Sequence, residues 1–206
     1  MREEFCRRYD SVIRAYLATR WRLPRTHEEV TEATQEVFLQ CLREGGALER
    51  VDPNRPGGMR GYLYGITSRT ASQFERQQAR WKRDGTGRAL EGDWIEADEA
   101  TLSRAFDRAW ASMLAREARR EHRRMAEAGS ERARLRLFCL EQRVYHGRWP
   151  REIAETVKLP AARVSELLHE AMGDYRAALL SVMASHHPNE SERELEKRCE
   201  ELGREL

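Results

Sequence analysis

Basic side chains concentrate in residues 60–90, where seven lysines and arginines stand against only two acidic residues, Glu75 and Asp84. The basic residues are Arg60, Arg69, Arg76, Arg80, Lys82, Arg83 and Arg88. Arginine holds phosphate through a planar fork of N–H donors, so a segment with this charge balance can bind a polyanion. The alternative interpretation is an ordinary solvated helix face.

The same segment is predicted to be one helix from about Met59 to Arg83. At about 100° per residue, four polar side chains fall within about 40° of Tyr62 around the helix: Arg69, Gln73, Arg76 and Arg80. A neighbouring side carries Leu63, Ile66, Thr67, Thr70 and Phe74. Arginines with a tyrosine and a glutamine at this spacing can hold phosphates, stack on an unpaired base and contact base edges. We therefore expect one side to pack and the other to face nucleic acid, unless the helix is merely a charged surface helix with Tyr62 half-buried.

A preceding helix is predicted to begin at Thr26, which forms a capping-box pattern with Glu29, and to end at Gly45-Gly46. Its expected core stripe is Val30, Ala33, Thr34, Val37, Phe38 and Cys41. The opposite side carries Glu32, Gln35, Glu36, Leu39 and Arg43. A leucine on a polar face favours a protein contact, although single exposed leucines are common on solvated surfaces.

Two short helical patterns, Pro150 to Val157 and Ala161 to Ala184, flank a turn at residues 158–160 and predict a helix-turn-helix. Its expected core is Ile153, Ala154, Val157, Leu159, Val164, Leu167 and Leu168. On the exposed side, Arg163, Ser165 and His169 can contact phosphates or bases. Glu166 and Glu170 repel phosphates unless a cytosine amino group or an arginine meets them. A purely structural or protein-binding role is the alternative.

The remaining segments are also predicted to be helical, and no strand pattern competes with them. An amphipathic helix is predicted from Phe5 to Leu17. A long helix carries one apolar stripe, made of Leu102, Phe106, Trp110, Met113 and Leu114. Two shorter helices are predicted, one from Leu135 to about Tyr145 and one with Leu195, Cys199 and Leu202 on its apolar side. We predict an all-α fold of two small helical domains joined by a linker, the second containing the helix-turn-helix. The expected parts are residues 1–84, a linker at 85–98, a second domain at 99–184 and an acidic C-terminal tail helix at 185–206.

Several classes of function are disfavoured. The chain has 206 residues and a net charge of +2, with no apolar run of about 18 residues and no apolar signal-peptide core, so we expect a cytoplasmic protein. Its four cysteines, Cys6, Cys41, Cys139 and Cys199, are widely separated and predict neither disulfides nor a zinc site. His186-His187 could approach Cys199, but adjacent imidazoles in a loop are usually exposed, and no metal or cofactor is predicted. Without a metalloprotease motif, a phosphate loop or a nucleophile elbow, no catalytic residue and no enzyme are predicted.

With these residues placed, the chain resembles the bacterial sigma-70 family, in its small two-domain extracytoplasmic-function (ECF) type. Residues 31–39, TEATQEVFL, look like the core-polymerase-binding helix of that family. Residues 59–66, MRGYLYGI, with the basic run to Arg83, look like its promoter-melting helix. Residues 106–110, FDRAW, and the turn between Glu152 and His169 are similar to its second domain.

The resemblance implies a sigma factor that binds core RNA polymerase and directs promoter recognition and DNA melting. Glu32, Gln35, Glu36, Leu39 and Arg43 would dock on the clamp helices of the polymerase. The minus-10 element of promoter DNA would be contacted by eight residues of the basic helix: Arg60, Tyr62, Arg69, Gln73, Arg76, Arg80, Lys82 and Arg83. The minus-35 element would be contacted by Arg163, Ser165 and His169. Glu166, Glu170 and Asp174 stand where the family usually has basic residues, so weak minus-35 binding is expected.

Three further expectations follow. An anti-sigma factor is a candidate partner, and no membrane contact is expected. The acidic tail, residues 190–206, is a candidate cover for basic surface, although simple solvation of its charges is the alternative. The competing function is a stand-alone helix-turn-helix regulator or a protein-interaction adaptor with a degenerate sigma fold.

Overall fold

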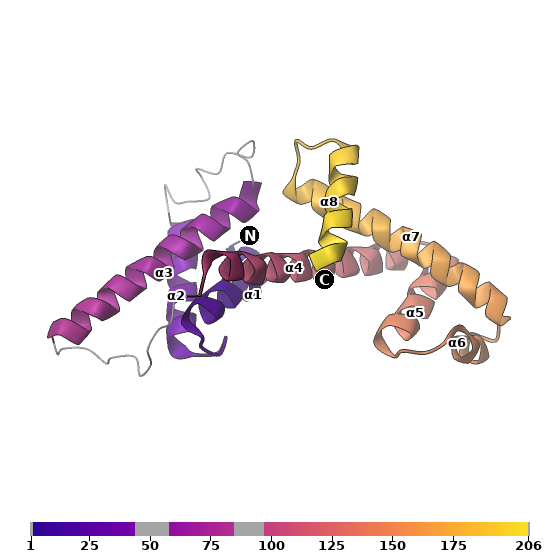
Figure 1. Cartoon of the computed structure of the whole chain (residues 1–206). Coiled ribbons are helices and arrows are strands. Elements are labelled where there is room, and N and C mark those ends of the chain that lie inside the picture. The colour runs from indigo at the N-terminus through magenta and orange to yellow at the C-terminus, as the bar shows by residue number, and fades with distance from the viewer. Residues whose placement is uncertain (1, 44–57, 85–96, 206) are drawn as a thin grey trace. The chain divides into compact units, whose positions relative to one another are not determined.

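The computed structural model describes residues 2–43, 58–84 and 97–205, and within these ranges the chain is all-helical, with eight helices and no strand (Figure 1). The helices are α1 (Arg2–Trp21), α2 (Glu28–Leu42), α3 (Gly58–Asp84), α4 (Glu99–Ala128), α5 (Glu131–Tyr145), α6 (Pro150–Val157), α7 (Ala161–His186) and α8 (Glu192–Glu205). The predicted all-α class is therefore confirmed for these residues. The predicted helix end at Gly45-Gly46, Arg88 and most of the linker lie outside them.

The chain divides into two compact units. Unit 1 runs to Met113 and takes in the last residues from Arg204, and unit 2 spans Leu114–Gly203. Residues 99–113, the first half of α4, thus group with α1, α2 and α3, whereas the sequence placed them in the second domain. The second half of α4 belongs to unit 2.

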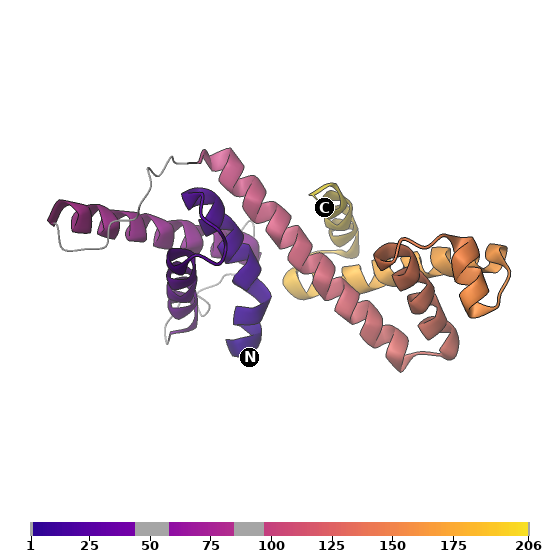
Figure 2. The same ribbon diagram turned by 90° about the horizontal axis from the view of Figure 1, so that it is seen from below.

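Unit 1 has a core built where the apolar stripes of α1, α2 and α3 meet (Figures 1 and 2). Helix α1 buries Val12, Ile13, Tyr16 and Leu17, α2 buries Val30, Ala33, Thr34, Val37 and Cys41, and α3 buries Leu63, Ile66, Thr67, Thr70 and Ala71. These are the stripes that the 3.6-residue period predicts. Two of the three buried threonines satisfy their hydroxyls within their own helices, since Thr34 donates to the Val30 carbonyl and Thr67 to that of Leu63.

Aromatic packing explains why the first half of α4 belongs to unit 1. The Phe106 ring lies edge-on to Tyr64, with centroids 5.2 Å apart, and Trp110 stacks on Tyr9 at 5.6 Å. Edge-to-face and offset pairs of this kind add to the stability gained from burial. The Arg60 guanidinium of α3 also forms an ion pair with Asp107 of α4.

The start of α2 differs from the predicted capping box. The N-cap is His27, one residue after Thr26, and its side chain makes no capping hydrogen bond. The residues before it form a turn in which the His27 N–H donates to the Pro24 carbonyl, 3.0 Å away. Arg14 of α1 holds this region by donating to the Arg25 carbonyl at 2.9 Å. The capping-box prediction was therefore wrong, because contacts with α1 move the beginning of the helix past Thr26.

In unit 2, α5, α6 and α7 pack around one cluster (Figure 2). Its buried members are Cys139, Ile153, Ala154, Val164 and Leu167, and Val157, Leu159 and Leu168 pack against it. Helix α6 begins at Pro150, with the Glu152 carboxylate accepting from the Trp149 N–H, and ends at Val157. The residue after it, Lys158, has a φ of 56°, which reverses the chain before α7. The seven expected core residues are thus together, and Cys139 of α5 lies at their centre.

Helix α8 completes unit 2. Ser191 and Glu194 form a reciprocal capping box, with the Ser191 N–H donating to the Glu194 carboxylate at 2.8 Å and the Glu194 N–H to the Ser191 hydroxyl at 3.4 Å. Its apolar side buries Leu195 and Leu202. Among the helices in the described ranges, none is both long and apolar enough to cross a membrane.

Candidate nucleic-acid and protein-binding surfaces

Helix α3 exposes four of its predicted DNA-binding side chains on one side, which we call the basic face: Arg69, Gln73, Arg76 and Arg80. The neighbouring side of the helix buries Leu63, Ile66 and Thr70 against the rest of unit 1. None of the three arginines has a carboxylate partner among the residues that the structure describes. Their positive charges are therefore available to an anionic ligand.

The acidic residue within this part of α3 is turned away from the basic face. Glu75 accepts hydrogen bonds from Arg20 of α1, at 2.6 Å to Nε and 2.9 Å to Nη2, and from the Trp21 indole N–H at 2.9 Å. The Glu75 hydrogen bonds hold the pKa of the Arg20 guanidinium above its ordinary value. This pair anchors α3 to α1 and neutralises the carboxylate that would otherwise oppose the basic face.

The other predicted residues of α3 are distributed differently. Arg60 lies about 160° around the helix from Tyr62 and pairs with Asp107, so it does not share the basic face. Tyr62 is half-buried, and Arg83 is exposed with its Nε 3.3 Å from the Ala79 carbonyl. The side chain of Lys82 lies outside the described part of the chain.

Sequence reasoning missed one aromatic residue beside this face. Trp81 is 38% exposed between Arg80 and the following basic residues, and an exposed indole among arginines can stack on an unpaired base. Its signal was the presence of a tryptophan in a strongly basic stretch.

Helix α2 presents the polar face that the sequence predicts. Glu32, Gln35 and Arg43 are exposed, Glu36 is half-buried, and Leu39 is 65% exposed in their midst. The core stripe on the opposite side is buried, apart from the half-buried Phe38. The α2 face therefore exposes one large apolar side chain among polar groups, as the sequence predicts.

The α2 and α3 surfaces adjoin in unit 1 through one side chain. Gln40 donates to Glu36 of the α2 face at 3.0 Å and to Gln73 of the basic face at 3.4 Å. Its own carbonyl accepts from the Thr70 hydroxyl at 3.4 Å. The surface with the exposed leucine and the surface with the free arginines are therefore contiguous.

The start of α7 shows a different arrangement. Arg163 pairs with Glu166 and lies 3.9 Å from Glu170, and the Ser165 hydroxyl donates to the Ala161 carbonyl at 3.1 Å. His169 is exposed. Of the three predicted contact residues on this helix, Arg163 and Ser165 already have partners inside unit 2.

Arginines of α5 meet the acidic residues of α7. Arg132 donates to Glu170 at 2.6 Å, and Arg136 donates to Asp174 at 2.6 Å and lies 3.4 Å from Glu170. The Arg132 hydrogen bond, with the nearby arginine charges, lowers the pKa of Glu170. The acidic residues of α7 are therefore paired with arginines of α5 and α7 within the protein itself.

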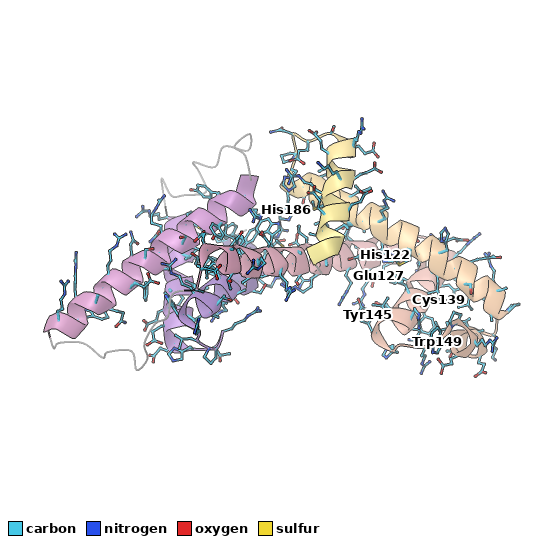
Figure 3. The ribbon with its side chains drawn as sticks, in the orientation of Figure 1. His122, Glu127, Cys139, Tyr145, Trp149 and His186 are labelled. Carbon is cyan, nitrogen blue, oxygen red and sulfur yellow. The ribbon has the colours of Figure 1, made fainter. Side chains whose placement is uncertain are left out.

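The histidine pair at the end of α7 is enclosed, contrary to the expectation of an exposed loop. The ring of His186, labelled in Figure 3, lies 3.1 Å from Glu117 of α4. His187 lies 3.3 Å from Glu190. Burial is the main reason that the pKa of His187 is lowered and that of the Cys199 thiol is raised. In the described ranges, no three histidine, cysteine or acidic side chains gather as a metal site would require. All four cysteines are free thiols, and burial raises the pKa of Cys41 to about 11.

The acidic tail helix makes one ion pair with a basic residue of α7. Glu196 lies 3.5 Å from Arg176, while Glu190 accepts from Arg198 of α8 itself. A restraining role for the tail remains a prediction.

A comparison of the chain with protein-family models, with curated proteins and with solved structures finds no match.

Proposed function

We propose that this protein is a sigma-type transcription initiation factor: it binds core RNA polymerase and, through unit 1, promoter DNA. The observation that carries the proposal is the contiguity of two surfaces in one small unit. The basic face has three arginines without carboxylate partners, and the α2 face beside it exposes Leu39. Residues 59–83 resemble the promoter-melting helix of the sigma-70 family, so we assign the basic face to DNA. Residues 31–39 resemble the polymerase-binding helix of that family, so we assign the α2 face to the polymerase.

The chemistry of the basic face suits separated DNA strands. Arginines neutralise phosphates, Gln73 can contact base edges, and Trp81 offers a stacking surface beside them. Contacts with unpaired bases offset the cost of opening the duplex. Promoter melting in this proposal is a binding effect and needs no catalytic residue.

The test is charge reversal on the basic face. Arg76→Glu with Arg80→Glu should reduce the yield of open complexes on a promoter, with reconstituted core polymerase, by at least about tenfold, because two phosphate contacts become repulsions. The matched control is Arg104→Glu with Arg108→Glu, two exposed arginines of α4 with the same spacing. Wild-type yield in the first variant, or equal loss in both, would contradict the assignment of α3 to DNA.

Polymerase binding needs a separate measurement. Comigration of the purified chain with core polymerase on a sizing column is expected, and Leu39→Ala should weaken it by about tenfold, as loss of a buried anchor does at an interface. Because Leu39 is exposed, this substitution should leave the fold intact.

The second candidate function is a helix-turn-helix regulator or adaptor that does not use the polymerase. The arginine–carboxylate pairing on α7 favours the adaptor form of this candidate, since a face neutralised within unit 2 has little charge left to bind DNA phosphates. Absence of comigration with core polymerase would support this function over the first.

A further inference from the structure

A pocket opens in unit 2 where α4, α5 and α7 pack together, with a volume of about 210 Å³. Most of its wall is apolar or aromatic and comes from α5 and α7: Leu137, Leu140, Val144, Tyr145, Met172 and Tyr175. Val144 and Met172 are 58% and 55% exposed, so the pocket opens onto the surface of the unit. None of these residues is among those that the proposed function assigns to DNA or to the polymerase.

One guanidinium at this pocket has no carboxylate partner among the residues that the structure describes. Arg119 of α4 is exposed and lines the pocket, with its guanidinium carbon 4.4 Å from the centre of the Tyr145 ring, which Figure 3 labels. Burial raises the pKa of the Tyr175 phenol and the charge of Arg119 opposes that rise, so the guanidinium lies near this second ring as well. A guanidinium stacked on a ring keeps the N–H donors at its edge available.

The acidic residue in the lining is already engaged. Glu141 of α5 forms an ion pair with Arg123, which lies one turn after Arg119 on α4. This pair cancels its own charges and leaves the positive charge of Arg119 without a counterpart at the pocket. A ligand with a negative charge at one end and an apolar body would therefore satisfy both the guanidinium and the apolar wall.

The size of the pocket narrows the class of ligand. An apolar cavity of about 150 Å³ holds benzene, so this pocket has room for one substituted aromatic ring. A helical partner would instead need a groove long enough for anchors at i, i+3, i+4 and i+7. We propose that this pocket binds a small aromatic carboxylate, with the ring against the apolar wall and the carboxylate on the Arg119 guanidinium.

The experiment uses the full-length protein with isotope-labelled methionine methyl groups, and two probes of nearly equal shape. At neutral pH p-toluate is charged and p-toluamide is not. In an NMR titration, p-toluate should shift the Met172 methyl signal saturably, with a dissociation constant of about 1 mM. The signal of Met125, an exposed α4 residue outside the lining, should not move. p-Toluamide should bind about fivefold more weakly, because it has no charge to pair with Arg119.

Substitution of Arg119 isolates the contribution of its charge. In Arg119→Gln the affinities for the two probes should agree within about twofold, because the ion pair is lost while the apolar wall remains. Arg120→Gln changes the next residue, which is exposed and does not line the pocket, and should keep the wild-type preference for p-toluate. Thermal melting checks that both variants are folded.

Four results would each overturn the proposal. The first is a Met172 signal that does not move at the solubility limit of p-toluate, and the second is an equal shift of the Met125 signal. The third is equal affinity of the wild-type protein for the two probes. The fourth is a preference for p-toluate that Arg119→Gln leaves unchanged or that Arg120→Gln reduces as much.

Discussion

Helices α3 and α7 both carry arginines at exposed or half-buried positions, but the surroundings of these arginines differ in charge. On α3 the acidic residue is withdrawn, because Glu75 is held by Arg20 and Trp21, and Arg69, Arg76 and Arg80 stay open to solvent. On α7, Glu170 and Asp174 are exposed or half-exposed but each is held by an arginine of α5.

For binding to DNA phosphates, the number of arginines without a carboxylate partner matters more than the total number of charged residues. An arginine already paired with a carboxylate must exchange one anion for another when it meets a phosphate, and gains little. A free arginine releases condensed counterions from DNA and gains affinity. The contrast between the two helices supports the proposal that unit 1 rather than unit 2 binds nucleic acid, and the following predictions test it from the largest expected effect to the smallest.

Removing the anchor of α3 should have the largest effect. Glu75→Ala removes the carboxylate that pairs with the Arg20 guanidinium in a mostly buried site, and should lower the free energy of unfolding of unit 1 by about 3 kcal/mol. Hydrogen-exchange mass spectrometry on α3 peptides measures this loss. The exposed Glu32→Ala on α2 serves as control and should change exchange little. Equal protection in both variants would show that the anchor contributes nothing.

Neutralising the basic face should weaken DNA binding without unfolding the unit. The triple change Arg69→Gln, Arg76→Gln and Arg80→Gln should reduce affinity for a single-stranded oligonucleotide by about a hundredfold at 0.1 M salt, and should reduce the slope of log affinity against log salt by about 2. Fluorescence anisotropy over a salt series measures both.

The same anisotropy measurement on a variant of unit 2 tests whether paired arginines contribute to DNA binding. Arg132→Gln with Arg163→Gln removes two paired arginines, and affinity should change by less than about threefold. A loss as large as that from the triple α3 variant would remove the distinction between the two helices.

Breaking the α5–α7 pairs should have a modest effect on stability. Arg136→Gln frees Asp174 and one side of Glu170, and should lower the free energy of unfolding of unit 2 by about 1 kcal/mol, because the pairs are only partly buried. Urea titration followed by hydrogen exchange in α7 detects the change. Arg151→Gln, an exposed α6 position, should have no measurable effect.

Lowering the pH below about 6.5 should slightly reduce the free energy of unfolding of unit 2, at pH values where its carboxylates are still ionised. Burial lowers the pKa of His122, with Arg136 acting in the same direction and Asp174 and Glu141 opposing it. The unfolded chain therefore takes up a proton near pH 6.5 that the folded unit does not, and stability is complete above that pH and falls as the pH drops towards the folded pKa. Urea midpoints at pH 7, 6 and 5 measure the decline.

Substitution of His122 measures how much of this loss of stability at low pH comes from His122 itself. His122→Gln should flatten the slope without abolishing it, since burial also lowers the pKa of His187. An unchanged slope would show that His122 has the same pKa in the folded and unfolded chains.

Much of the fold could be predicted from the sequence, because helical periodicity is a local property. The stripe from Leu102 to Leu114 is buried as expected, and the face of α2 with Leu39 is exposed as expected. Periodicity tells which side of a helix is covered but not by which partner. The grouping of Phe106 and Trp110 with unit 1 therefore had no signal in the spacing of the residues.

Local capping patterns were less reliable than periodicity. Thr26 with Glu29 and Ser191 with Glu194 have the same spacing, yet the structure forms the box only at Ser191. Contacts of Arg14 with the turn before α2 decide the first case. A tertiary hydrogen bond outweighs a cap whose typical contribution is about 1 kcal/mol.

By itself, the sequence determined that the described chain is helical, which faces are apolar, and where arginines are dense, because these follow from residue type and a period of 3.6. Only the tertiary structure decided which charges remain free. The partners of Glu75, Glu170 and Asp174 lie 34 to 55 residues away in the chain. Ion pairs over such separations depend on how helices pack, and that packing places Arg20 on Glu75 and leaves the basic face of α3 unopposed.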